Sequence, residues 1–243
     1  KPASRIKGGR LALAAQPARV VSLVVSDVPR DNPAEVASGP TVADGASAAR
    51  ALELAAQWRI DLPDAVRAHL ETGAEPPLAE NDPRLSRVET HVIASAKQSL
   101  EAASAWAEAQ GIRTRILSDS IEGEAHDVGM VHAAIAREVA LENRPFQAPV
   151  LLLSGGETSV TLRDAPGRGG RNTAFLLAFA QEIDGVPGVQ ALAADTDGID
   201  GSEDNAGAFA DGTSLERLRA AGLLAADFTA KQDPYGAFEA LDD

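Results

Sequence analysis

Residues 19–44 read RVVSLVVSDVPRDNPAEVASGPTVAD, and this stretch decides the fold class. Residues 19–25 form an apolar, β-branched run, which is typical of a strand packed on both faces. The run stops at Ser26 and Asp27, after which three prolines and a Ser-Gly-Pro-Thr turn build a rigid, polar loop. A strand followed directly by such a loop predicts a sheet that presents polar side chains at the ends of its strands.

Outside this stretch, segments typical of strands and of helices alternate along the chain. Further strands are predicted at 88–94, 112–117, 150–153, 159–162 and 189–194. Helices are predicted at 6–15, 46–58, 63–71, 96–110, 123–142, 172–183 and 213–221. The alternation indicates βαβ units, so we expect an α/β fold with a largely parallel sheet: a Rossmann-like end of a first domain, followed by a second α/β domain.

The segment 72–87 (TGAEPPLAENDPRLSR) contains prolines and acids without periodicity, which favours a linker. We therefore predict that 1–87 is the C-terminal part of a first domain, 88–148 a connecting α/β region and 149–243 a second, incomplete domain. The chain begins without an initiator methionine and ends without a tail. These ends predict a piece of a longer protein.

The composition argues against several classes of function. A net charge of −14 argues against nucleic-acid binding, because no basic surface is available to displace phosphate counterions. No apolar run approaches the roughly twenty residues of a transmembrane helix, so no membrane partner is expected. The chain has no cysteine, which removes disulfides, thiolate catalysis and sulfur metal sites and fits a cytoplasmic protein.

Four loops that follow predicted strands carry residues able to do chemistry, and ligands of parallel sheets bind at this edge. In the first loop the prolines hold Asp27 in place; the alternative is a capping aspartate in a tight turn. The second loop is Ser154, Gly155, Gly156 and Glu157, whose paired glycines let a phosphate or carboxylate approach backbone amides. Its alternative interpretation is a simple hairpin turn.

The third loop, 167–172, reads GRGGRN and leads directly into a predicted helix. With Gly169, Gly170 and Asn172 it offers backbone amides and the positive end of the helix dipole to an anion, and Arg171 adds a planar fork for a carboxylate or phosphate. It is neither a P-loop nor a dinucleotide fingerprint, since no GK[ST] follows and asparagine stands where the last glycine is required. The alternative is a flexible surface loop.

The fourth loop, 195–201, reads DTDGIDG. Asp195 and Asp197, with a third carboxylate at Asp200, suit Mg²⁺ that is held partly by water and partly by substrate phosphate. An EF-hand is excluded, because Ala206 stands where that loop requires a bidentate glutamate. The alternative is a solvated acidic turn.

The sequence offers little support for a metal site built from histidines or for a serine hydrolase. The four histidines show no metal-ligand spacing and are predicted to be structural or surface residues: His69, His91, His126 and His132. The motif G-x-S-x-G is absent, which argues against a Ser-His-Asp hydrolase.

Five blocks stand in the chain in a specific order: KGGRLA at 7–12, SDVPRDNPAEVASGPTVAD at 26–44, LLLSGGETSVTL at 151–162, GRGGRNTAFLLA at 167–178 and DTDGIDG at 195–201. Together they resemble the bacterial and archaeal glycerate 2-kinase family, whose members carry a C-terminal MOFRL domain and are often named provisionally as hydroxypyruvate reductases. The family's GAGKAA-type motif with its catalytic lysine, its SGGGSAL-type loop and its C-terminal GPTGTNVNDL-type segment have no counterpart here. The resemblance therefore implies the end of a first domain, the connector and most of a MOFRL-type domain.

The resemblance implies ATP-dependent phosphorylation of D-glycerate at its 2-hydroxyl, giving 2-phosphoglycerate and ADP, with Mg²⁺. It implies that Arg171 grips the glycerate carboxylate or the transferring phosphoryl group. Asp195 and Asp197 would hold Mg²⁺ or orient the hydroxyl, and Asp27 is a competing candidate for activating it. The other loop residues would line the nucleotide or substrate pocket: Ser154, Gly155, Gly156, Glu157, Gly169, Gly170 and Asn172.

Two other functions stay open. An NAD(P)H-dependent hydroxypyruvate reductase would need a G-x-G-x-x-G loop and a histidine placed as the acid for hydride transfer, and the sequence shows neither. A non-catalytic metabolite-binding module would bind glycerate without turnover. In each case the partners are small molecules, with a homodimer as a candidate assembly.

Overall fold

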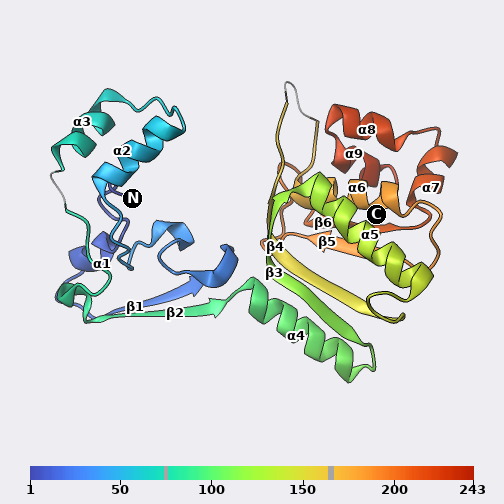
Figure 1. The fold of residues 1–243 in the computed structure, drawn as a ribbon, viewed down its shortest axis with the longest axis horizontal. Helices are drawn as coiled ribbons and strands as arrows, with labels where there is room; N and C mark the ends of the chain where they lie inside the picture. The colour runs from blue at the N-terminus through green and yellow to red at the C-terminus, as the bar shows by residue number, and fades with distance from the viewer. Residues whose placement is uncertain (74–75, 164–166) are drawn as a thin grey trace. The chain divides into compact units, whose positions relative to one another are not determined.

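The computed structural model describes residues 1–73, 76–163 and 167–243. The chain forms two compact units, Lys1–Ala103 and Ser104–Asp243. Both units combine helices with strands, which confirms the α/β fold class (Figure 1). The limit between the units falls inside helix α4 (Ala96–Ala109), and the domain limits at 87 and 148 stay predictions.

The first unit is built around two parallel strands. β1 (Val20–Val25) pairs with β2 (Val88–Ala94), which confirms both predicted strands. Besides the start of α4, the helices and 3-10 turns described in this unit are α1 (Arg10–Ala14), η1 (Pro29–Asp31), η2 (Val36–Ser38), α2 (Ala48–Gln57), α3 (Asp64–Thr72) and η3 (Pro83–Leu85). Two residues of the predicted linker 72–87, Ala74 and Glu75, lie outside the described residues.

The sequence predicts that β1 is packed on both faces, but in the structure one face of the strand is exposed. Successive side chains of a strand point to opposite faces, and Val21, Leu23 and Val25 are each more than half exposed. Ser22, on the other face, is half-buried, and its Oγ lies 2.7 Å from Thr41 Oγ1. The loop that follows β1 therefore contacts one face of the strand, while the apolar face stays exposed within this chain.

The second unit contains two strand pairs. β3 (Thr114–Glu124) pairs in parallel with β4 (Leu151–Ser159), whereas β5 (Gln190–Ala194) pairs antiparallel with β6 (Gly207–Asp211). The sequence does not predict β6, because its GAFAD segment lacks the β-branched residues that indicate a strand. Parallel pairing is therefore confirmed for β1–β2 and β3–β4, and the β5–β6 pair departs from it.

The helices described in this unit, besides the end of α4, are α5 (Ala125–Glu142), α6 (Arg171–Glu182), α7 (Ser214–Ala220), α8 (Ala225–Lys231) and α9 (Pro234–Glu239). α5 and α6 pack closely at Gly129, where a Cβ would lie 2.4 Å from the carbonyl oxygen of Phe175. Glycine is needed there because no side chain fits between the two helices. No helix in the described ranges combines the length and the apolar character that a membrane span needs.

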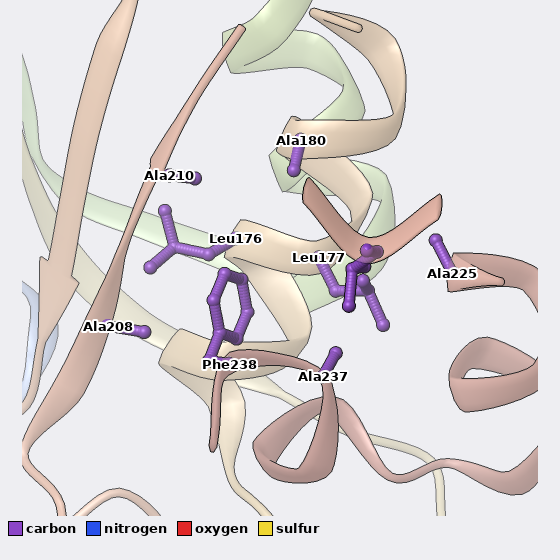
Figure 2. Close-up of a cluster of buried hydrophobic side chains, with 9 residues drawn as sticks. Leu176, Leu177, Ala180, Ala208, Ala210, Ala225, Ala237 and Phe238 are labelled. Carbon is purple, nitrogen blue, oxygen red and sulfur yellow. The ribbon is translucent and has the colours of Figure 1, made fainter. Parts of the chain in front are cut away.

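The main hydrophobic core of the second unit forms around α6. Leu176 and Leu177 are buried between alanines of β6 and residues of α8 and α9, including Phe238 (Figure 2). Small alanine side chains let these elements approach α6 closely, which is how a chain with only 4% aromatic residues reaches close packing. This packing places the first residue of α6 beside the loop between β5 and β6.

A second core cluster provides a stability test. Ile183 is fully buried directly after α6 and packs with Phe179, Val189 and Ala133. We expect Ile183→Val to lower the free energy of unfolding by about 1 kcal/mol, because it deletes one buried methylene. Ile112→Val is the control, since Ile112 is 45% exposed. Urea unfolding followed by circular dichroism compares the two, and equal midpoints would contradict the predicted difference.

Candidate active site

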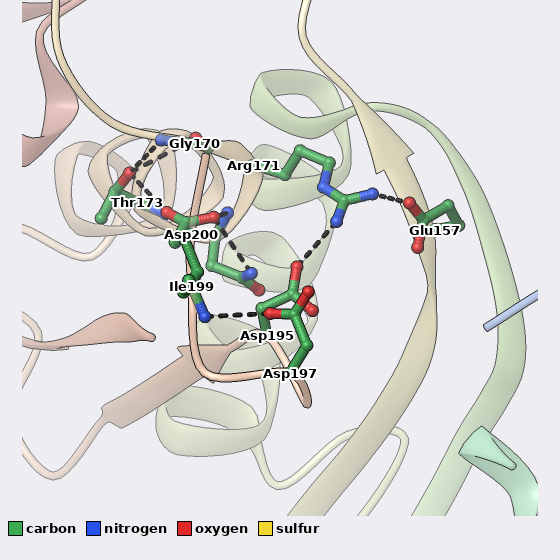
Figure 3. A network of polar contacts seen from close by, with 9 residues as sticks. Glu157, Gly170, Arg171, Thr173, Asp195, Asp197, Ile199 and Asp200 are labelled. Carbon is green, nitrogen blue, oxygen red and sulfur yellow. Dashed lines mark hydrogen bonds and ion pairs between the residues drawn. The ribbon is translucent and has the colours of Figure 1, made fainter. Parts of the chain in front are cut away.

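Arg171, the first residue of α6, connects two carboxylates that come from different strands. Its Nη2 donates to Asp195 Oδ2 at 2.7 Å, and its Nη1 forms an ion pair with Glu157 (Figure 3). Glu157 lies on β4 and Asp195 directly follows β5. The Arg171 and Asp195 side chains are only 33% and 17% exposed, so solvent screens this pair less than a surface pair. The structure therefore brings three predicted site residues together; we call them the arginine network.

The DTDGIDG loop holds its two predicted metal ligands in different ways. Asp195 enters the arginine network, whereas Asp197 is exposed and its Oδ1 accepts a hydrogen bond from the Ile199 amide at 2.9 Å. The Asp195 amide donates to the Ala206 carbonyl at 2.7 Å, which ties the start of the loop to the residue before β6. Both carboxylates thus lie on one loop that is held by backbone hydrogen bonds.

The donor set of Asp195 and Asp197 suits a magnesium ion that is shared with a substrate. Mg²⁺ usually keeps several waters and binds through one or two carboxylates plus substrate phosphates. Within the described ranges, no group of three or more His, Cys, Asp or Glu side chains is arranged to hold a metal ion. The residues therefore fit a cation held jointly with a nucleotide, and they do not form a closed protein cage.

Asp200, the third carboxylate of the DTDGIDG loop, caps α6 and is not available to a cation, contrary to the sequence prediction. Its carboxylate is completely buried and accepts hydrogen bonds from the amides of Asn172 (2.9 Å) and Thr173 (2.8 Å). These are two of the amides that the sequence pattern predicts to be free for an anion, and in the structure they are already satisfied. Capping residues are recognised just before a helix, whereas Asp200 lies 28 residues after Asn172, so the local sequence carries no signal for this cap.

The two glycine-bearing loops of the site touch through backbone atoms. A Cβ on Gly170 would lie 2.5 Å from the carbonyl carbon of Asp200, and a Cβ on Gly201 would lie 2.4 Å from the Gly169 carbonyl oxygen. Side chains at these positions would therefore push the loops apart. Gly170 and Gly201 therefore allow the two loops to approach each other closely.

The GRGGRN loop is also anchored to α9. The Arg168 amide donates to Asp233 Oδ1 at 3.2 Å, and the Arg168 guanidinium donates to Glu239 at 2.9 Å and lies 4.9 Å from the centre of the Tyr235 ring. The hydrogen bond to Glu239 raises the pKa of Arg168 above its ordinary value. The loop is therefore held by its own side chains, which disfavours the alternative of a flexible surface loop.

β4 runs straight through the SGGE segment instead of turning there. Its pairing extends over Leu151–Ser159, and Gly156 lies opposite Ile121 of β3. The hairpin alternative is therefore wrong. The strand predicted at 150–153 is observed as the start of β4, whereas of the strand predicted at 159–162 only Ser159 belongs to β4. Gly156 has φ +150°, and a Cβ there would lie 2.1 Å from the Ile121 carbonyl oxygen. Gly156 allows β3 and β4 to approach each other closely. A sequence pattern does not distinguish such a strand glycine from the glycine of a turn.

Ser154, also on β4, contacts a histidine that the sequence suggests is structural or exposed. His132 Nε2 lies 2.9 Å from Ser154 Oγ, and His132 Nδ1 lies 2.8 Å from the Val128 carbonyl oxygen. Because a carbonyl can only accept, Nδ1 carries a proton, and in the Nδ1–H tautomer Nε2 accepts the hydroxyl hydrogen of Ser154. His132 therefore directs the Ser154 hydroxyl toward α5.

Asp27 belongs to the first unit, where it is exposed and follows β1. It forms no hydrogen bond or ion pair with the residues that the structure describes, so the alternative of a capping aspartate is not observed. Elsewhere in this unit, the amides of Gly8 and Gly9 donate to the carbonyls of Ser38 (3.2 Å) and Gly39 (2.9 Å). The KGGR and SGP motifs thus meet within this unit. A shared role of Asp27 with the arginine network stays a prediction.

Two family models match the chain: the MOFRL family over residues 150–243, and a domain of unknown function (DUF4147) over residues 1–71. A glycerate kinase from Macaca fascicularis is 32% identical, and the match covers 98% of this chain and 70% of that protein. The chain belongs to the glycerate kinase family. This confirms the resemblance that the five sequence blocks indicate.

Other relatives match this chain over a smaller share of their own length. A glycerate 2-kinase from Pyrococcus horikoshii is 39% identical, over 92% of this chain and 51% of its own. A relative from Agrobacterium vitis is 48% identical, over 100% of this chain and 62% of its own, and has the provisional name hydroxypyruvate reductase. The crystal structure of a glycerate kinase from Thermotoga maritima matches with a TM-score of 0.83 and 34% identity, over 98% of this chain and 55% of that one. The chain therefore spans 51–62% of the length of these three proteins.

Proposed function

We propose that the full-length protein containing this chain transfers the γ-phosphoryl group of ATP to the 2-hydroxyl of D-glycerate, giving 2-phosphoglycerate and ADP. The observation that carries the proposal is the guanidinium of Arg171, held between Glu157 and Asp195. Phosphoryl transfer depends on positioning and on neutralisation of charge more than on covalent catalysis, and a fixed arginine supplies both. Relatives from Pyrococcus horikoshii and Thermotoga maritima are named glycerate 2-kinase and D-glycerate 2-kinase, and these names support the same reaction.

Arg171 is the group proposed to bind the charged part of the substrates. The carboxylates of Glu157 and Asp195 hold its side chain in one orientation before any ligand arrives. The Nη2 group of Arg171 would exchange Asp195 for a ligand and donate to an oxygen of the glycerate carboxylate or of the transferring phosphoryl group, while Asp195 would be left to hold Mg²⁺. One carboxylate oxygen is then replaced by one ligand oxygen, so the guanidinium keeps an anionic partner throughout.

Asp195 and Asp197 are the proposed ligands of Mg²⁺, which would neutralise charge on the β- and γ-phosphates when bound. In the transfer, the 2-oxygen of glycerate forms a bond to the γ-phosphorus, and the bond from that phosphorus to the bridging oxygen breaks. The hydroxyl proton goes to a carboxylate, and the exposed Asp27 is proposed for this role. The remaining predicted residues would line the nucleotide or substrate pocket: Ser154, Gly155, Gly156, Glu157, Gly169, Gly170 and Asn172.

A hydroxypyruvate reductase is the second candidate, because the relative from Agrobacterium vitis bears that name provisionally. Such an enzyme transfers a hydride from a nicotinamide cofactor and needs a proton donor beside the substrate carbonyl. The side chains that meet Arg171 are both carboxylates, and the GRGGRN loop lacks the dinucleotide fingerprint. These features favour the kinase.

Two incubations of the full-length protein distinguish the candidates. With D-glycerate, ATP and Mg²⁺ we expect release of ADP, and phosphorus NMR of the product should show phosphorylation at the 2-position. With hydroxypyruvate and NADH we expect a flat absorbance trace. Oxidation of NADH without release of ADP would replace the kinase by the reductase. Binding of D-glycerate by calorimetry without either turnover would favour the non-catalytic binding module.

Further expectations belong to the same proposal. We expect the protein to act on small molecules in the cytoplasm, without nucleic-acid or membrane partners, and a homodimer is the candidate assembly. Light scattering during size-exclusion chromatography of the full-length protein measures that assembly directly.

A further inference from the structure

Asp200 contacts more of the GRGGRN segment than a helix cap requires. Its Oδ1 accepts hydrogen bonds from the Asn172 amide at 2.9 Å and from the Asn172 side-chain Nδ2 at 3.2 Å. Its Oδ2 accepts hydrogen bonds from the amide and from the hydroxyl of Thr173, both at 2.8 Å. Asp200 and Thr173 are both 0% exposed. The carboxylate therefore binds, without competition from water, the two residues that follow Arg171.

The bond to Asp200 decides which end of the Asn172 side-chain amide is available. A carboxylate accepts hydrogen bonds, so the NH₂ group of Asn172 has to face Asp200. The carbonyl oxygen of Asn172 then has no hydrogen-bond partner in the described part of the chain. Asn172 is half-buried next to Arg171, so this oxygen is the polar group that its side chain has left for a ligand.

We propose that Asp200 is a positioning residue that fixes Asn172 as a hydrogen-bond acceptor in the candidate site. An acceptor oxygen repels the anionic oxygens of a phosphate, whereas it attracts the hydrogen of a hydroxyl group. The ligand group assigned to Asn172 is therefore a hydrogen-bond donor, such as a hydroxyl of D-glycerate or of the ribose of ATP. This assignment of the ligand rests on the proposed function, while the orientation of Asn172 rests on the hydrogen bonds alone.

The same contacts fix Arg171, which lies between Gly170 and Asn172. Gly170 packs so closely on Asp200 that a Cβ would lie 2.4 Å from its Oδ1. Asp200 therefore holds the residues on both sides of Arg171. The hydrogen bonds of the buried Asp200 carboxylate thus place the Arg171 cation and the neutral carbonyl oxygen of Asn172 next to each other at the start of α6.

The isosteric substitution Asp200→Asn tests the proposal. Its carbonyl oxygen can still accept from both donors of Thr173, so α6 keeps part of its cap. Its NH₂ group would face Asn172, where it would lose the hydrogen bond from the Asn172 backbone amide and reverse the side-chain amide, which would then present a donor to the ligand. We expect kcat/KM of the full-length protein to fall about 100-fold, the scale of a misplaced active-site group, while the folded fraction measured by circular dichroism stays high.

The reciprocal double variant Asn172→Asp with Asp200→Asn provides the rescue. The new carboxylate at position 172 accepts from the new amide at position 200 and keeps its second oxygen for the ligand. We expect it to recover about tenfold in kcat/KM over Asp200→Asn alone, within the usual range of coupling between contacting residues. A residue that acts only as the cap of α6 would show no such recovery, because the double variant does not restore the hydrogen bond from the Asn172 backbone amide.

Asp204→Asn is the matched control, because it removes the same charge from an exposed residue of the neighbouring segment. We expect it to keep the kinetics of the wild type. Wild-type kcat/KM in Asp200→Asn, or a double variant no better than Asp200→Asn, would overturn the proposal.

An NMR measurement keeps this test independent of the reaction. If the wild-type protein phosphorylates no glycerate, the proposed function fails, while the orientation of Asn172 can still be judged. Its side-chain NH₂ signals, identified by their loss in Asn172→Asp, should exchange slowly with solvent in the wild type and faster in Asp200→Ala. Equal exchange in the wild type and in Asp200→Ala would overturn the role of Asp200.

Discussion

Arg171→Ala is expected to lower the turnover number of the full-length protein by about three orders of magnitude, the scale of losing an arginine that stabilises a transferring phosphoryl group. The substitution removes the one cation of the arginine network. Glu157 and Asp195 would then face each other without compensation, at the place where anionic substrates have to bind. Both the lost attraction and the new repulsion act against phosphoryl transfer.

Steady-state kinetics with D-glycerate and ATP measure this effect. Arg171→Lys keeps the charge but loses the planar fork, so we expect a loss that is smaller than that of alanine but still clear. Arg144→Ala is the control, because Arg144 is an exposed arginine that pairs with Glu138. Turnover of Arg171→Ala equal to that of Arg144→Ala would remove Arg171 from the mechanism.

Gly156→Ala is expected to destabilise the second unit by about 4 kcal/mol, which combines overpacking, backbone strain and weakened strand pairing. A Cβ at this position would lie 2.1 Å from the carbonyl oxygen and 2.3 Å from the amide nitrogen of Ile121, and φ is +150°. β3 and β4 would have to separate at this point. Because Glu157 follows directly on β4, the ion pair with Arg171 would shift as well.

Gly111→Ala is the matched control for this variant. Gly111 also has a positive φ (+80°), but no atom lies within 4 Å of the position of its Cβ. It therefore reports backbone strain without a clash, and we expect a loss of about 1 kcal/mol. Thermal unfolding followed by circular dichroism compares the two variants. Equal melting temperatures would show that β3 and β4 adapt to a side chain at position 156.

The helices around the site follow from local sequence. The helix predicted over 172–183 is observed as α6 (Arg171–Glu182), and the helix predicted over 123–142 is observed as α5 (Ala125–Glu142). Both carry long apolar segments, and glycines precede α6, so neighbouring residues are sufficient to locate them. β6 and the continuous course of β4 were not predictable, because an alanine-rich strand and a strand glycine are defined by the partner they pair with.

The candidate site was predictable as a set of loops. Arg171, Glu157 and Asp195 stand in short motifs whose residue types suit phosphate chemistry. Their mutual contacts were not predictable, and neither was the buried position of Asp200. The pattern of donors at the start of α6 looked free in the sequence, yet Asp200 already uses the amides of Asn172 and Thr173.

The α/β class, the helix predicted over 172–183 and the glycine- and acid-bearing loops follow from the sequence, because these depend on residues that are neighbours in the chain. The tertiary structure alone decided that Asp195 pairs with Arg171 and that Asp200 caps α6. These hydrogen bonds join residues 24 and 28 positions apart, and such partners are chosen by how closely the backbones of two loops can pack. At this site, the glycines at 170 and 201 permit that approach.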